Sequence, residues 1–206
     1  MTKTGSKVEP QFSEPLEELV DSLRQLPGVG ERSARRMAYH LLQYDPAGGL
    51  RLAAALDNAL NHLRHCKLCN SFTMDEVCAT CSDEARDHSV LCVVETPVDQ
   101  NMIESTRSYQ GLYYVLMGKL QPIQGVGAAS LGLQALIERA QDGQIEEVIL
   151  ATNYTTEGET TAHYLSELLK PHNIKVSRIA RGVPAGSELE YVDAGTIAWA
   201  LMERKS

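Results

Sequence analysis

Four of the five cysteines in this 206-residue chain fall within sixteen positions, and no other feature constrains the fold as strongly. They form two Cys-x-x-Cys pairs, Cys66 with Cys69 and Cys78 with Cys81. A tight turn in each pair can direct both thiolates to one ion, and four sulfurs complete the tetrahedral shell of Zn²⁺. The eight residues between the pairs hold few large hydrophobic side chains, so metal binding would supply much of the local folding energy. The sequence predicts one structural zinc per chain, with no coordination position open for catalysis.

Two disulfides or a redox-active Cys-x-x-Cys are the alternatives to zinc. The first fifteen residues are polar and lack the apolar core of a signal peptide, and no apolar run approaches the length of about eighteen residues that spans a membrane. We therefore expect a flexible tail over residues 1–15, no membrane association and a reducing, cytoplasmic location. That location and the presence of two pairs favour zinc, and they leave Cys92 as a buried free thiol.

Two helices joined by a glycine turn are predicted before the cysteines. Apolar residues recur at helical spacing from Leu16 to Leu26, Pro27 ends that helix, and Gly28-Val-Gly30 makes a short turn. A second helix follows, with an apolar face opposite its arginines. Residues 46–64 predict a further helix, with Leu56, Leu60 and Leu63 on its buried side.

The glycine turn and the arginines form a candidate phosphate site. Residues 24–36 contain four arginines against one glutamate, a local charge of +3 in a chain whose net charge is −8. Glycines let a phosphate approach backbone N–H groups, and the positive end of the helix dipole adds attraction. The predicted contacts to the DNA backbone are Gly28, Gly30, Arg32, Arg35 and Arg36. An ordinary helical hairpin with a solvated arginine face fits the spacing alone equally well.

After Cys81 the pattern changes to strands that alternate with helices. The predicted strands are residues 90–94, 113–117, 147–151 and 174–179, and the predicted helices are 131–140, 160–169 and 192–202. This alternation predicts a parallel sheet whose functional edge lies beyond the carboxyl ends of its strands. Glu95, Asn153 and Glu157 are expected on that edge. Arg178 and Arg181 are expected either to pair with nearby acids or to face DNA.

The acidic residues at this edge resemble the pattern of the Toprim domain. Topoisomerases, primases and some nucleases share that fold and hold Mg²⁺ with a Glu after the first strand and an Asp-x-Asp loop after a later one. Here Glu95 fits the first position, but Asn153 and Thr155 stand where the pattern has aspartates. The remaining charge is too small for a catalytic Mg²⁺ site, and no nucleophile has an activating base beside it in the sequence.

The string from Leu26 to Arg36 resembles a helix-hairpin-helix DNA-binding motif, and the cysteines follow it closely. With the Glu-Gly-Glu loop at 157–159, the combination resembles the RecR family of bacterial recombination mediators. That resemblance implies an α/β chain of several parts: a tail (1–15), a helical helix-hairpin-helix region (16–64), a small four-cysteine zinc finger (65–82), a Toprim-like parallel-sheet domain (88–180) and a C-terminal turn and helix (181–206).

The resemblance also implies a function without catalysis. A protein of this family would bind single- and double-stranded DNA, form a ring-shaped tetramer, and act with RecO and in some settings RecF. Together they would load the strand-exchange recombinase onto DNA coated by single-stranded-DNA-binding protein. The resemblance offers Glu95, Asn153, Glu157 and Glu159 as an acidic docking surface for RecO or as a weak Mg²⁺ site.

Two other functional classes compete with this interpretation. One is a Mg²⁺-dependent Toprim nuclease or primase-like enzyme that uses Glu95 and Glu157. Asn153 and Thr155 argue against it. The other is a purely structural zinc adaptor that never touches nucleic acid, and the arginine face argues against that one.

Overall fold

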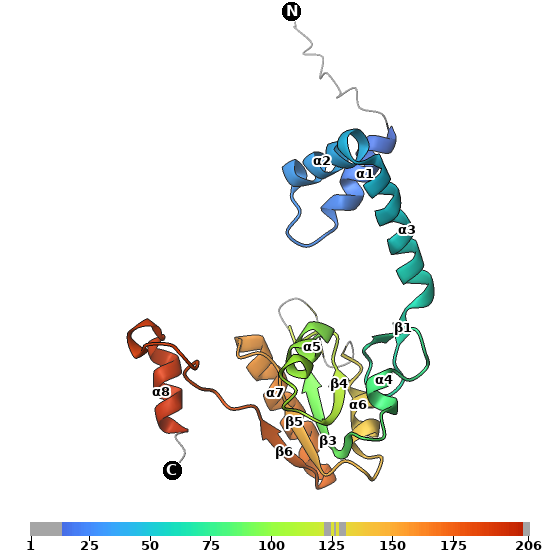
Figure 1. Cartoon of the computed structure of the whole chain (residues 1–206). Helices are drawn as coiled ribbons and strands as arrows, with labels where there is room; N and C mark the ends of the chain where they lie inside the picture. The colour runs from blue at the N-terminus through green and yellow to red at the C-terminus, as the bar shows by residue number, and fades with distance from the viewer. Residues whose placement is uncertain (1–13, 122–124, 126, 128–130, 204–206) are drawn as a thin grey trace, which may run out of the picture. The chain divides into compact units, whose positions relative to one another are not determined.

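The computed structural model describes residues 14–121, Gly125, Gly127 and residues 131–203, and the chain divides into two compact units after His62 (Figure 1). Residues 1–13 of the expected tail lie outside the described residues, whereas Glu14 and Pro15 already belong to the first helix. Each unit has hydrophobic clusters of its own. No helix within the described ranges is long and apolar enough to cross a membrane.

The N-terminal unit is helical, as predicted. Its elements are α1 (Glu14–Arg24), α2 (Glu31–Tyr39), the π-helix η1 (His40–Tyr44) and α3 (Pro46–His62). Val20 of α1 packs against Ala34 and Ala38 of α2, and all three are almost fully buried. Because both α2 residues are alanines, the two helices can approach each other closely.

The third helix differs from its prediction in burial. Its extent is close to the expected range, but within the described chain α3 buries none of its side chains. Leu56 and Leu60 are exposed, as is Leu63 just beyond the helix, so the expected buried side is wrong for this chain taken by itself. Periodicity identified an apolar face on α3, but no described element of the N-terminal unit covers that face.

The C-terminal unit begins with a knuckle made of two-residue strands and one short helix. Strand β1 (Arg64–His65) pairs antiparallel with β2 (Phe72–Thr73), and α4 (Ala79–Ser82) follows. These elements surround the four cysteines.

A four-stranded parallel sheet of order β4-β3-β5-β6 forms the rest of this unit, as the strand-helix alternation predicted. The strands are β3 (Asp87–Val94), β4 (Gly111–Val115), β5 (Glu147–Leu150) and β6 (Lys175–Arg178). The helices are α5 (Pro97–Thr106), α6 (Leu133–Ala140), α7 (Thr156–Leu169), η4 (Lys170–His172), η5 (Leu189–Tyr191) and α8 (Ala194–Met202).

The two faces of the sheet have separate cores because side chains alternate along each strand. Leu91 and Val93 point to the face where Leu136 of α6 and Leu165 of α7 pack. Cys92 and Val94 join the opposite core, with Ile103 of α5 against it. Cys92 is therefore the buried free thiol that the sequence predicted, and burial raises the pKa of that thiol to about 12.

One boundary matters for the site. Helix α7 begins at Thr156, four residues earlier than predicted, because the Thr155 hydroxyl caps it by accepting a hydrogen bond from the Gly158 N–H at 3.2 Å. Glu157 and Glu159 therefore lie in the first helical turn and not in a loop. Acidic residues are favourable there because the positive end of the helix dipole attracts them.

Candidate functional site

The four cysteines converge on one point. The sulfur atoms of Cys66, Cys69, Cys78 and Cys81 all lie within 4.8 Å of one another. A tetrahedral Zn²⁺ with bonds of about 2.3 Å to sulfur needs sulfur-sulfur separations of about 3.8 Å. Small adjustments would therefore bring all four thiolates to bonding distance from one ion.

The sulfur distances exclude disulfides between these cysteines. Cys69 Sγ and Cys78 Sγ are 3.5 Å apart, far beyond the disulfide length of about 2.05 Å, and all five cysteines are free. Hydrogen bonds from the thiols of Cys69 and Cys81 lower the pKa of the Cys78 thiol, and the same hydrogen bonding raises the pKa of Cys69 and Cys81. Without metal the cluster therefore favours one thiolate, at Cys78, and a bound cation would favour loss of the other protons.

The knuckle is joined directly to the sheet. Val115 in β4 donates its backbone N–H to the carbonyl of Cys69 at 2.8 Å. Asn70, in the left-handed conformation with φ 62°, donates its side-chain amide to the carbonyl of Val115 at 2.7 Å. The residue after the second cysteine therefore covers the outer edge of β4, which would otherwise expose unpaired backbone groups.

The glycine turn between α1 and α2 has the predicted form. Val29 donates its N–H to the carbonyl of Leu26, and Gly28 has φ +78°, a conformation that glycine adopts readily. Gly30 is the N-cap of α2, and no side chain caps that helix end. A β-carbon added at Gly28 or Gly30 would meet no atom within 4 Å, so the backbone of the turn is open to approach.

The arginines around this turn fall into two groups. Arg35 donates to both carboxylate oxygens of Glu17 at 2.9 and 3.1 Å, and to Glu31 at 2.7 Å. Its pKa is raised, first by Glu17. Arg24 pairs with Asp21 and Glu31. By contrast, Arg32 and Arg36 are exposed and form no ion pair with any described residue, so the local charge of +3 is presented mainly by these two.

The carboxyl edge of the sheet brings Glu95 and Asn153 together. Glu95 follows β3 and Asn153 lies in the loop after β5, the strand beside it. Oε1 of Glu95 accepts the backbone N–H of Asn153 at 2.8 Å, and Oε2 accepts its side-chain amide at 2.8 Å. Glu95 is only 4% exposed, so it is not the open acidic group that we expected on this edge.

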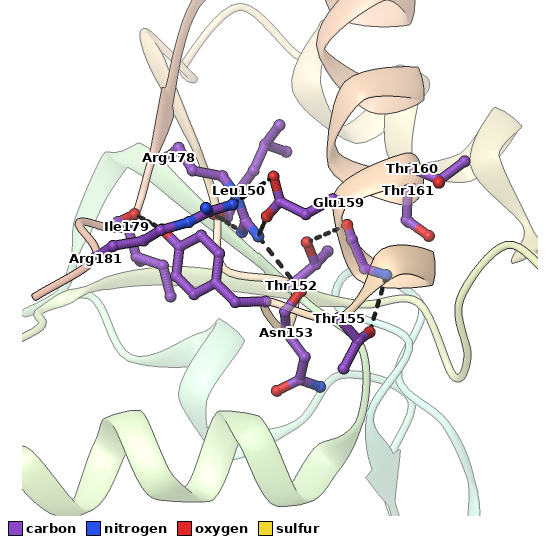
Figure 2. Close-up of polar contacts among 12 residues, drawn as sticks. Leu150, Thr152, Asn153, Thr155, Glu159, Thr160, Thr161, Arg178, Ile179 and Arg181 are labelled. Atoms are coloured by element: carbon purple, nitrogen blue, oxygen red, sulfur yellow. Dashed lines mark hydrogen bonds and ion pairs between the residues drawn. The ribbon is translucent and has the colours of Figure 1, made fainter. Parts of the chain in front are cut away.

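The other two acids of the set have basic partners. Glu157 lies 3.5 Å from the ammonium group of Lys119, and its own backbone N–H and Lys119 lower its pKa. Glu159 binds Arg178 and Arg181, each at 2.8 Å (Figure 2). Partial burial raises the pKa of Glu159, but these two arginines outweigh that effect and lower it overall. Of the two roles expected for Arg178 and Arg181, pairing with nearby acids is the one observed.

An aromatic and arginine stack beside Glu159 was not predicted. The Arg181 guanidinium carbon lies 4.3 Å from the ring centre of Tyr154 and 4.3 Å from that of Trp199 in α8. Arg178 also lies over Tyr154, at 4.4 Å. No local sequence pattern connects these residues. Tyr154 lies in the loop after β5, Arg181 lies in the segment after β6, and Trp199 lies in α8.

Comparison with known families gives four matches in chain order. The matching models are described as RecR, helix-hairpin-helix (residues 16–60); RecR, four-cysteine zinc finger domain (63–83); Toprim domain (89–180); and RecR, C-terminal (182–205). The four-cysteine cluster lies within the zinc finger match, so the chain has one structural zinc site. The parallel sheet and the Glu95–Asn153 edge lie within the Toprim match.

Proposed function

Because the chain belongs to the RecR family, we propose that it acts with RecO, and in some settings RecF, to load the strand-exchange recombinase onto DNA coated by single-stranded-DNA-binding protein. Membership supports the broader role directly: a recombination mediator in DNA repair. We place this function in the cytoplasm and assign it to a ring-shaped tetramer that binds single- and double-stranded DNA.

The observation that carries DNA binding is the pair of arginines on α2 that form no ion pair within the described chain. Arg32 and Arg36 lie on the helix that follows the open glycine turn, while Arg24 and Arg35 already have carboxylate partners. Guanidinium groups of this kind can neutralise phosphates without first breaking an ion pair. The proposed contacts are therefore Gly28, Gly30, Arg32 and Arg36. Arg35 would orient α2 through Glu17, and it would contact DNA only at the cost of that bond.

The test is DNA affinity measured against salt concentration for the Arg32→Ala/Arg36→Ala protein. Each phosphate contact to duplex DNA contributes about −0.9 to the slope of log affinity against log salt, so the double variant should lose about 1.8 units of slope for each subunit that contacts the DNA. Its affinity should fall at low salt, and the DNA should stay intact in Mg²⁺.

The matched control is Arg24→Ala/Arg51→Ala, which removes the same charge from arginines that pair with Asp21, Glu31 and Asp45. This control should keep most of the wild-type slope. Equal losses in both variants would mean that net charge, and not the α2 surface, governs binding. Cleaved DNA would instead support the Toprim enzyme alternative.

The absence of catalysis is part of the proposal and rests on the carboxyl edge. Glu95 is buried against Asn153, and the two acids of α7 have Lys119, Arg178 and Arg181 as partners.

We propose that RecO docks at Glu157, whose side chain is 45% exposed. Glu159 would stiffen the same surface through its two arginines.

Binding of purified RecO to the Glu157→Lys protein tests the docking surface. Charge reversal should weaken binding at least tenfold, because a lysine at position 157 would repel the basic surface of RecO that an acidic docking surface attracts. Glu138→Lys, a charge reversal at an exposed residue of α6, should bind RecO as the wild type does. Equal affinity of the Glu157 variant and the wild type would place the docking site elsewhere.

Sedimentation and DNA binding together test the ring. Several weak phosphate contacts add up when subunits repeat the α2 surface around one opening. We expect a tetramer at micromolar concentration. Equal DNA affinity in a variant that remains a monomer would contradict a binding mode that depends on the ring.

A further inference from the structure

The Glu95 carboxylate lies where the Toprim fold would hold a divalent cation, and it is already fully engaged by one residue. Both of its oxygens accept hydrogen bonds at 2.8 Å, one from the backbone and one from the side-chain amide of Asn153. A carboxylate that is 4% exposed needs either a cation or directed donors to offset its lost hydration. Asn153 supplies two donors from a single residue.

The donor set at this edge does not suit Mg²⁺. That ion requires oxygen ligands at about 2.0–2.1 Å in octahedral geometry. Here the group facing Oε2 of Glu95 is an amide N–H, which donates to oxygen and cannot ligate a metal through that nitrogen. An aspartate at 153 would instead bring two carboxylates face to face, an arrangement that requires a cation or a proton between them.

The start of α7 closes over this pair. A β-carbon at Gly158 would lie 2.0 Å from the carbonyl oxygen of Asn153 and 2.8 Å from Oε1 of Glu95. Thr152, completely buried, donates its hydroxyl to the carbonyl of Gly158 at 2.8 Å. The contact between Glu95 and Asn153 therefore fixes the loop after β5 and the first turn of α7, which carries Glu157.

We propose that the amide of Asn153 replaces a divalent cation at this edge, so that the loop after β5 and the start of α7 are held in place without metal. Asn153 is a positioning residue: it acts through Glu95 and presents the first turn of α7. This inference concerns only the Toprim-like domain, and it stands whether or not the protein binds RecO.

The experiment compares the melting temperature of three zinc-loaded, full-length proteins with and without millimolar MgCl₂. The wild type should not respond to Mg²⁺. Asn153→Asp should melt roughly 5–10 °C lower without Mg²⁺, because two carboxylates then face each other, and Mg²⁺ should restore most of that loss. Asn153→Ser loses the amide without adding charge, so it should melt lower and gain little from Mg²⁺.

Mn²⁺ provides a direct probe of the same site by electron paramagnetic resonance. Asn153→Asp should bind one Mn²⁺ per chain at concentrations where the wild type binds none. A rise in the melting temperature of the wild type with Mg²⁺ that Glu95→Gln abolishes would overturn the proposal. So would an Asn153→Asp protein that, without metal, is as stable as the wild type.

A double-mutant cycle keeps the proposal testable if Asn153→Asp does not fold. The loss of melting temperature caused by Asn153→Ser should shrink by at least half when Glu95 is already Gln, because the amide then no longer compensates a buried charge. Full additivity of the two changes would show that Asn153 does not act through Glu95, and would overturn the proposal.

Discussion

The zinc knuckle and the carboxyl edge of the sheet are both places where side chains could gather around a metal, and they differ in what those side chains already bind. The four cysteine sulfurs face one another within 4.8 Å, and they have few donors besides themselves. At the edge, Glu95 has both oxygens occupied by Asn153, and Glu159 has two arginines.

This difference shows how a fold can keep the shape of a metal site with or without the metal. Four thiolates repel one another and have only a few backbone N–H donors to offset their charge, so the knuckle depends on its ion. At the edge, an amide and three basic side chains supply the positive ends of hydrogen bonds and ion pairs. The edge is therefore complete as a protein structure, whereas the knuckle is complete only with zinc.

The largest effect is expected where the knuckle loses its ion. Structural zinc contributes on the order of 10 kcal/mol to the folding of small zinc modules, so Cys81→Ser should lose most of its zinc and melt more than about 10 °C lower. The edge of β4 would also lose the cover that Cys69 and Asn70 provide, which should promote aggregation. Metal analysis and thermal unfolding measure both effects.

Cys92→Ala is the matched control, because Cys92 is a buried thiol outside the cluster. It should keep one zinc per chain and lose only about 1 kcal/mol of stability through the small cavity. If Cys81→Ser kept a full zinc and its wild-type melting temperature, Cys81 would not be a ligand.

Gly158→Ala should give the next largest loss of stability, and it disrupts the carboxyl edge of the sheet. The added β-carbon would overlap the carbonyl oxygen of Asn153, a backbone atom that cannot move aside without shifting the loop. We expect a cost of about 3 kcal/mol, measured by urea unfolding. Gly182→Ala, where nothing lies within 4 Å, should change stability by less than about 0.5 kcal/mol. Equal costs at the two glycines would show that α7 does not depend on close approach to Asn153.

The knuckle could be predicted from the sequence and the contacts of the edge could not, for a physical reason. Metal ligands such as Cys66 and Cys69 are close in the chain, so their spacing alone predicts their convergence. The parallel sheet was also predictable, because buried strands read as continuous apolar runs. Glu95 and Asn153, however, are 58 positions apart, and their hydrogen bonds follow from the pairing of β3 with β5.

The same limit explains the two surprises in the helical unit. The arginines of α2 looked alike in the sequence, but Arg35 reaches across to Glu17 of α1, and only the packing of the two helices reveals that pair. The leucines of α3 follow a helical period that predicts an apolar face. Periodicity does not say whether the covering partner belongs to the same chain.

Acid should weaken the edge through its carboxylates. The pKa values of Glu157 and Glu159 both lie below the ordinary value of 4.5, so their contribution to stability is full above that pH and is lost as pH falls through their folded values. Because Glu159 is 43% exposed, solvent screening limits its share to about 0.5–1 kcal/mol. Unfolding free energies of zinc-loaded protein, measured from neutral pH to below pH 4.5, should fall less steeply for Glu159→Gln. An unchanged slope would mean that the two arginine pairs add no stability.

The smallest expected effect concerns the stack that joins α8 to the edge. Arg181→Lys keeps the charge beside Glu159 but loses the flat guanidinium that lies 4.3 Å from the rings of both Tyr154 and Trp199. Stability should fall by only about 0.5 kcal/mol, whereas the fluorescence of Trp199, the single tryptophan of the chain, should shift because its stacked partner is gone. Arg178→Lys changes the cation over Tyr154 alone and should leave that emission unchanged. Identical spectra for wild type and Arg181→Lys would show that this stack does not hold α8 to the carboxyl edge. The contacts that stabilise the edge would then end at the ion pairs of Glu159.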